Sequence, residues 1–304
     1  MKSWVVYGLV AILAVGLAVF VTLAVVARNQ ALDLIHNPLE AREALDTSPS
    51  DFGLAYEDVT VTSEDGFRLA GWYVPGENGA VIMAQHGLKS NRAAMLEEAE
   101  MLHDSGYGVL ITSTRAHDAS EGELISFGMH EMKDWEAWYQ FLMGQDDVDP
   151  GMIGVLGTSL GATEAIQYAS INENIGAVVA HSPFSSIDDT VSVSVTALTG
   201  LPPFPFAPLV VFWAEQELGF DSAEIDAKLW IDDISPRAVL ILQAGQDTVV
   251  SPASGELLLA AAGQPAELWF EPDLGHAAFD TEFPDEFEQR VVGFFDQYLL
   301  AMTP

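Results

Sequence analysis

The sequence predicts an α/β fold in which a mostly parallel sheet of about eight strands carries helices on both faces. Three observations support it. From Tyr56 onward, short apolar runs alternate with segments of helix length, as in strand–helix–strand units. Several runs are apolar throughout, which is typical of strands covered on both faces. In addition, one charge-free stretch, Trp4 to Ala27, predicts an N-terminal transmembrane helix before the domain.

The elements are expected in a regular order. "EDVTVTS" and "FRLAGWYV" flank "EDG", which predicts a β-hairpin with a type I′-like turn. The further expected strands are "AVIMAQHG", "YGVLITST", "MIGVLGTS", "IGAVVAHS", "RAVLILQAG" and "AELWFE". The expected helices are 92–103, 129–143, 161–170, 253–262 and 283–300. This alternation places most strands parallel to one another.

Residues 185–235 interrupt the alternation between two core strands. The segment is apolar and rich in proline, as in "LTGLPPFPFAPLVVFW". Because it is too long for an ordinary connection, we expect an inserted cap that covers the site. A helical excursion that only packs on the sheet is the alternative.

Composition excludes several classes of function. With 304 residues, 49% of them hydrophobic, the chain can bury a sizeable core. It has no cysteine, which excludes disulfides, thiolate metal sites and a cysteine nucleophile. The formal net charge of −34 disfavours nucleic acid and highly phosphorylated substrates. A salt-adapted or extracytoplasmic protein fits this acidity.

The stretch "WVVYGLVAILAVGLAVFVTLAVVA" predicts a single-pass anchor within residues 1–28, with the lipid bilayer as its partner. At about 1.5 Å per residue it can cross a core of about 30 Å. A cleavable signal peptide has a shorter apolar region and is the alternative. Lys2 and the amino terminus outweigh Arg28, which favours a domain outside the cytoplasm. Residues 29–55 are expected to form a linker, and 56–304 the domain.

Three residues follow predicted strands in an order that indicates nucleophilic catalysis. Ser159 ends "IGVLGTS" and opens a helix, with Gly157 and Gly161 leaving room for a tight turn. Asp247 follows "AVLILQAG" and His276 follows "AELWFE". Carboxyl ends of parallel strands meet at one edge of a sheet, so we expect these groups to be neighbours. A serine hydroxyl needs a base to become a nucleophile, and His276 with Asp247 supplies one.

A further motif predicts an oxyanion hole. His86 and Gly87 end the strand "AVIMAQHG". Acyl transfer requires N–H donors aimed at the developing negative charge. The backbone N–H groups of Leu160, just after the nucleophile, and of Leu88, just after "HG", are the expected donors. His86 is expected to have a structural hydrogen-bonding role.

The series "HG…GTSLG…GQD…GH" resembles the α/β-hydrolases of the serine aminopeptidase/lysophospholipase-like group, in particular bacterial membrane-anchored members. The resemblance covers about Tyr56 to Leu300. It implies the α/β-hydrolase fold and hydrolysis of an ester, thioester or amide without a cofactor. The family often has Arg-Gly-His-Gly-x-Ser after its fourth strand. Here "TRAHDASEG" has Ala116 and Asp118 in place of the two inner glycines.

The expected function is therefore a membrane-anchored serine hydrolase that cleaves a carboxylic ester or thioester, in a small molecule or a peptide. A serine peptidase acting on peptide amides is the alternative, because an acidic surface suits cationic peptides. A catalytically inactive, membrane-tethered binding protein is a third reading. The histidines lack metal-ligand spacing, so no metal is expected, and the resemblance implies no cofactor. The sequence specifies no oligomeric state.

Overall fold

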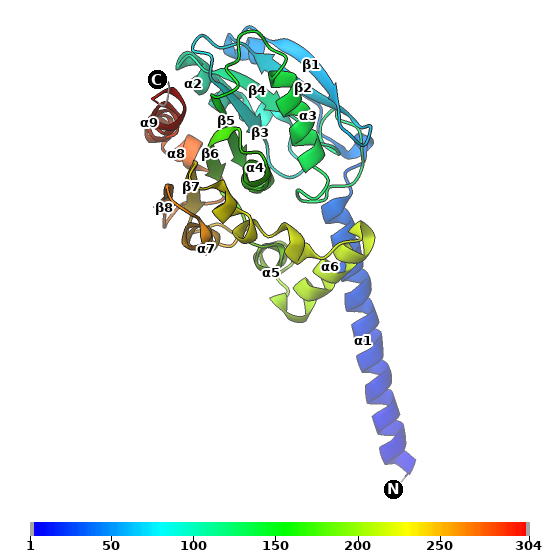
Figure 1. Ribbon diagram of the computed structural model, residues 1–304. Helices are drawn as coiled ribbons and strands as arrows, with labels where there is room; N and C mark the ends of the chain where they lie inside the picture. Colours follow the sequence, from blue (N-terminus) through cyan, green and yellow to red (C-terminus); the bar gives the residue numbers. More distant parts are fainter. Residues whose placement is uncertain (1–2, 302–304) are drawn as a thin grey trace.

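A computed structural model describes residues 3–301 and contains one eight-stranded sheet in the order β1-β2-β4-β3-β5-β6-β7-β8 (Figure 1). β2 pairs antiparallel with β1 and β4, and the other neighbours are parallel, which confirms the mostly parallel sheet. The strands are β1 Glu57–Thr62, β2 Arg68–Val74, β3 Val81–Gln85, β4 Gly108–Thr112, β5 Ile153–Thr158, β6 Ile175–His181, β7 Ala238–Ala244 and β8 Ala266–Glu271.

The hairpin of β1 and β2 is confirmed, but its expected type I′ turn is wrong. A type I′ turn needs positive φ at both central residues. Here only Gly66 has positive φ, at 93°. The Ser63 hydroxyl accepts the Phe67 N–H at 3.1 Å and donates to Asp65 at 2.8 Å. These side-chain bonds select a different turn within the same loop.

Helices cover both faces of the sheet. On one face, α2 and α9 pack with Ile82 and Ile111, and on the other α3, α4 and α7 pack with Met83 and Val155. Both faces of the central strands are therefore buried, which explains why their sequences are apolar throughout. The helices are α2 Leu96–Asp104, α3 Met132–Leu142, α4 Leu160–Ile171, α7 Ser254–Ala261, α8 Phe279–Glu282 and α9 Pro284–Phe295.

Two helices lie between β6 and β7, in the segment where the sequence breaks its alternation. They are α5, Ile187–Thr199, and α6, Pro203–Leu218, and we call them together the α5–α6 hairpin. Three short 3₁₀ turns between 222 and 234 lead from the hairpin to β7. A third apolar cluster joins the hairpin to α1 and to Leu160 at the start of α4.

α1 spans Ser3–Ile35 and projects from the domain as one continuous helix (Figure 1). It is long and apolar enough to cross a membrane, with a mean hydropathy of 3.0 in its most apolar window. Ala27, Ala31 and Ile35 are buried against the domain, so the helix continues beyond the expected end of the span. Lys2, which enters the expected orientation, lies outside the described residues.

The segment expected as a linker is tied to the domain. The Asn37 N–H donates to Glu123 O at 2.8 Å. The Arg42 guanidinium donates to Ser120 O at 2.6 Å and also to Gly122 O. The residues that make these contacts directly follow α1 in the chain. The apolar helix therefore has a defined position relative to the sheet.

Candidate active site

Ser159 lies on a sharp turn between β5 and α4. Its φ of 58° and ψ of −114° are unusual for a residue with a side chain. Such conformations cost of order 1–3 kcal/mol and persist where the surroundings enforce them. Here the Ser159 N–H donates to His181 O at 2.8 Å, and Ser159 O accepts the Ala162 N–H at 3.1 Å. These two hydrogen bonds hold the turn in its unusual conformation.

Close backbone contacts around this turn require its glycines. A Cβ on Gly157 would lie 2.1 Å from Gly161 O, and one on Gly161 would lie 2.4 Å from Gln85 O. A Cβ on Gly87 would lie 3.2 Å from the Ser159 Cβ. The expected room for a tight turn is therefore present, and it also lets the end of β3 approach the serine.

The structure brings the three expected catalytic side chains together. His276 Nε2 lies 2.9 Å from Ser159 Oγ, and His276 Nδ1 lies 2.6 Å from Asp247 Oδ2. The other oxygen of Asp247 accepts the backbone N–H groups of Val249 and Val250, each at 2.8 Å. With Nδ1–H donating to Asp247, Nε2 is left to accept the serine proton. The Asp247 side chain is fully buried, whereas His276 is 20% exposed.

The segment after β3 lies beside the serine. His86 is buried, and its Nδ1–H donates to Gly87 O at 2.8 Å. Burial lowers the pKa of His86 to about 3, so its ring is neutral at pH 7. The ring therefore makes one hydrogen bond, to the backbone of its own segment. Leu88 and Leu160, the expected oxyanion donors, directly follow Gly87 and Ser159 in the chain.

His117 positions this segment, a contact that sequence reasoning missed. Its Nε2 accepts the Lys89 N–H at 3.0 Å, and its Nδ1–H donates to Arg115 O at 2.9 Å. Burial lowers the pKa of His117 to about 4, so the ring is neutral and can accept at pH 7. The only sequence signal was the place of His117 in the segment "TRAHDASEG".

At the two positions where the similar family has glycine, this chain has other residues but still adopts a positive φ, which glycine adopts most readily. Ala116 has φ 60° and Asp118 has φ 45°. Two arginines bond to Asp118, and the Asn37 side chain donates to Ala116 O at 2.7 Å. Arg92 donates to the Asp118 carboxylate, in an ion pair whose side chains are at most 7% exposed. Arg42 donates to Asp118 O at 3.2 Å. The departure from the family pattern therefore changes side chains at the rim while the loop path is retained.

His181 ends β6 close to the site, but its ring packs away from the chemistry. Its centroid lies 5.5 Å from Phe279 and 5.6 Å from Phe287. Burial lowers the pKa of this histidine to about 3. Its contribution to the site is the backbone oxygen that holds Ser159. Among residues 3–301, no group of three His, Cys, Asp or Glu side chains is placed to hold a metal.

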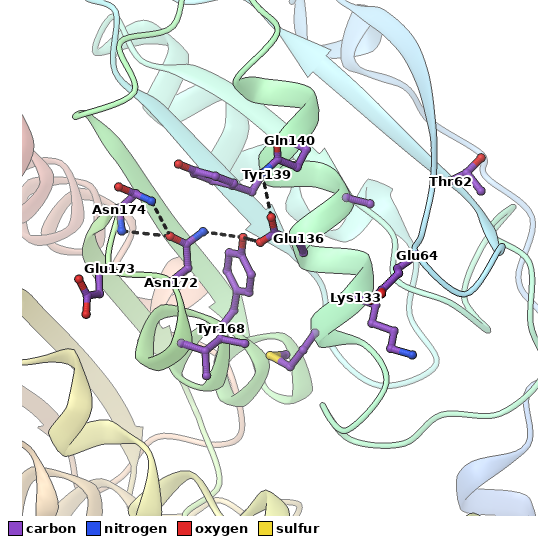
Figure 2. Close-up of a pocket in the computed structure, with 13 residues that line it drawn as sticks. Thr62, Glu64, Lys133, Glu136, Tyr139, Gln140, Tyr168, Asn172, Glu173 and Asn174 are labelled. Atoms are coloured by element: carbon purple, nitrogen blue, oxygen red, sulfur yellow. Dashed lines mark hydrogen bonds between the residues drawn. The ribbon is translucent and has the colours of Figure 1, made fainter.

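A surface hollow lies elsewhere on the domain. A groove of about 740 Å³ is bounded by α3 and by Asn172–Asn174, which precede β6 (Figure 2). Ser159 is at the opposite, carboxyl end of the strands. The polar groups of the groove bond to one another, as in Tyr168 Oη–H to Glu136 at 2.8 Å and Asn172 Nδ2–H to Tyr168 Oη at 2.7 Å. It is a surface groove away from the reactive side chains.

Comparison with known proteins gives the family. The sequence model of X-Pro dipeptidyl-peptidase (S15 family) matches residues 69–201. An uncharacterized protein of Mycobacterium tuberculosis is 31% identical over 225 residues, 73% of each chain. The protein YqkD of Bacillus subtilis is 27% identical over 239 residues, 78% of each chain. The α/β hydrolase domain-containing protein WAV2 of Arabidopsis thaliana is 32% identical over 151 residues, 48% of each chain.

Solved structures agree. The esterase Pf2001 of Pyrococcus furiosus superposes with a TM-score of 0.72 at 27% identity, covering 85% of this chain and 98% of the esterase. The α/β hydrolase GrgF of a Penicillium species has the same fold, with a TM-score of 0.68 at 17% identity, over 81% of this chain and 100% of its own. Fold and relatives define a hydrolase of the α/β type. The chain belongs to the α/β-hydrolase superfamily, which confirms the resemblance in its sequence.

Proposed function

We propose that this protein is a membrane-anchored serine hydrolase that cleaves carboxylic esters or thioesters through an acyl-enzyme on Ser159. One observation carries the proposal: an unbroken hydrogen-bonded chain from Ser159 Oγ through His276 to Asp247. This chain has the geometry that removes a proton from a serine as it attacks a carbonyl. An inactive binding protein would have no need of it.

The reaction proceeds in two steps. Ser159 Oγ attacks the substrate carbonyl while His276 Nε2 takes its proton, and Asp247 stabilises the resulting imidazolium. The tetrahedral oxyanion then accepts hydrogen bonds from the N–H groups of Leu88 and Leu160. His276 gives its proton to the leaving group, and water resolves the acyl-enzyme by the same route in reverse.

The proposed oxyanion donors are supported by their availability. Across the described part of the chain, neither the Leu88 nor the Leu160 N–H donates to a protein acceptor. Leu160 is also the first residue of α4, and the N-terminus of a helix favours negative charge. Each such donor typically contributes about 2.7–4 kcal/mol to the transition state.

An ester is favoured over a peptide amide by two observations. The esterase Pf2001 matches over nearly its whole length. In addition, Leu160 belongs to an apolar cluster that extends into the α5–α6 hairpin, and we propose that this hairpin covers an apolar acyl group. The peptidase alternative is favoured by the match of residues 69–201 to the X-Pro dipeptidyl-peptidase family.

We further propose that α1 is an uncleaved anchor, with the domain on the outer side of the membrane. Its side chains are exposed and apolar over the stretch that precedes Ala27. One face of the last turns, with Ala27, Ala31 and Ile35, is buried against the domain, which favours retention of the helix over its removal as a signal sequence.

Two substrate sets separate the enzyme readings. The full-length protein in detergent is assayed with p-nitrophenyl esters of increasing acyl length and with X-Pro dipeptide p-nitroanilides. We expect ester hydrolysis that is absent in Ser159→Ala, and little anilide cleavage. Faster cleavage of the anilides would favour the peptidase. Equal rates for the wild type and Ser159→Ala on both sets would refute the proposed mechanism.

A further inference from the structure

The α5–α6 hairpin has an unusual composition for this chain. From Thr190 to Ala214 it contains no charged residue, although the protein has 45 acidic and 11 basic residues. The segment "LPPFPFAP" at its turn is apolar throughout. Four of its residues are prolines, which have no N–H to leave unpaired in an apolar medium.

The two faces of this hairpin differ. Phe206 and Val210 are buried in the cluster shared with α1. On the outer face, Phe204 is 79% exposed and Phe212 is 47% exposed, and Pro202 is exposed beside them. Exposed aromatic side chains on a charge-free surface mark a contact with an apolar partner.

The turn of the hairpin is directed toward the part of α1 that can span a membrane. Arg28 lies over the Trp213 ring at 5.9 Å, and His36 lies 3.8 Å from Glu217. Both pairs advance together along the chain, so α6 crosses α1 with its start on the side of the α1 N-terminus (Figure 1). The start of α6 therefore lies nearest the span, on the side of the domain from which α1 projects (Figure 1).

We propose that the turn of the α5–α6 hairpin, residues 199–206, lies in the interfacial layer of the bilayer that α1 crosses. The inference rests on the membrane anchoring proposed above and extends it to a second contact. Aromatic side chains are favoured at the headgroup level, where their rings are partly desolvated. Acidic residues there would be repelled by anionic lipids, which accounts for their exclusion from this part of an acidic chain.

This contact fixes the orientation of the domain. A single helix would leave the domain free to rotate and tilt about its axis. A second contact beside the helix holds the carboxyl edge of the sheet, where Ser159 lies, at a defined angle to the membrane surface. The hairpin is also part of the cluster that contains Leu160, so the apolar contact continues from the bilayer to the residue after the serine.

The absence of cysteine allows a direct test with single-cysteine variants of the full chain. Phe204→Cys reports on the hairpin, Val15→Cys on the proposed span, and Phe270→Cys on β8 at the far edge of the sheet. All three sites are exposed, at 79%, 64% and 41%, so a label there does not disturb packing. Each variant is labelled with NBD and reconstituted into phosphatidylcholine/phosphatidylglycerol vesicles that contain nitroxide-labelled lipid.

We expect nitroxide lipids to quench NBD attached through Phe204→Cys and Val15→Cys, and to leave the label of Phe270→Cys bright. Quenching equal to that of Phe270→Cys would overturn the hairpin contact. So would a blue-shifted but unquenched Phe204→Cys label whose emission depends on protein concentration, because this indicates contact with a second copy. Quenching through Phe204→Cys without quenching through Val15→Cys would retain the hairpin contact and refute the span.

Discussion

At the scale of single residues, Asp247 has the most constrained surroundings of the proposed triad. Its carboxylate is fully buried and accepts three hydrogen bonds, one from His276 and two from backbone N–H groups. These bonds fix the carboxylate so that it holds one tautomer of the histidine. This geometry therefore orients His276, the proposed base, in addition to placing it near the serine.

Asp247→Asn tests that orientation. The amide keeps the shape but presents an N–H that favours the wrong histidine tautomer, and we expect kcat on a p-nitrophenyl ester to fall by about 10⁴-fold. Circular dichroism and the unfolding midpoint check that the fold is retained. A loss smaller than about tenfold would show that Asp247 does not orient the base.

His117 should act on the reaction through the segment after β3, which carries the proposed oxyanion donor Leu88, without touching the substrate. His117→Phe removes the acceptor of the Lys89 N–H and frees the residues that follow Gly87. We expect kcat to fall by up to about 10²–10³-fold, the effect of losing one oxyanion donor, with KM little changed. The matched control is His130→Phe, since His130 is an exposed histidine. An equal rise in KM would indicate a substrate-binding role instead.

At the scale of elements, the turn between β5 and α4 depends on the approach of β3. Gly157 and Gly161 allow backbone atoms to meet where a side chain would not fit. Ser159 and the segment after β3, which carries Leu88, are therefore packed against the same glycines. A substitution of one of these glycines is expected to affect both.

Gly161→Ala should disturb this junction. Its Cβ would lie 2.4 Å from Gln85 O and 2.6 Å from His86 O, and neither backbone can move cheaply. We expect a loss of about 1–3 kcal/mol in the free energy of unfolding, together with a loss of activity. Gly293→Ala, at an exposed position of α9 with open space around it, should instead gain up to about 1 kcal/mol. Similar effects of both substitutions on urea unfolding would contradict the packing argument.

Much of the element order could be predicted from the sequence, because buried strands are apolar throughout and Ser159, Asp247 and His276 each follow one. What could not be predicted depends on contacts between distant segments. The helix expected at 129–143 begins only at Met132, because the Glu131 carboxylate accepts the N–H groups of Ser126 and Gly128. Such side-chain hydrogen bonds cannot be predicted from the periodicity of apolar residues.

The candidate site also has features that could be predicted from the sequence and features that could not. The proposed reactive residues could be predicted from motif order, whereas the contacts that support the rim could not. Asp118 adopts positive φ while it is bonded by Arg42 and Arg92, which precede it by many residues. Neither arginine has a local pattern that signals this role, so sequence alone indicated only that the family glycines were absent.

At the scale of the whole molecule, the acidity of the chain is distributed unevenly. Residues 3–27 of α1 and 190–214 of the α5–α6 hairpin contain no charged residue and contribute to one apolar cluster, whereas the acidic residues lie elsewhere in the chain. One of the acids, Glu98 on α2, is only 4% exposed. Burial, assisted by the nearby Asp280, raises the pKa of Glu98 to about 8 from an ordinary 4.5.

Glu98 should make stability depend on pH. Between about pH 4.5 and 8 the folded state keeps this proton and the unfolded state does not, so stability falls as pH rises, by about 1.4 kcal/mol per pH unit at most. Glu98→Gln remains neutral and should lose this dependence. Urea unfolding of both proteins in detergent from pH 5 to 8 measures the difference. Parallel stability curves would show that Glu98 is ionised in the fold.

The central claim is that Ser159 is a nucleophile activated by His276. Its most direct test is labelling of the full-length protein with a fluorophosphonate, followed by mass spectrometry of the labelled peptides. The account predicts one covalent label per chain, on Ser159, and none in Ser159→Ala or His276→Ala. A label on another residue, or labelling that persists in Ser159→Ala, would contradict it.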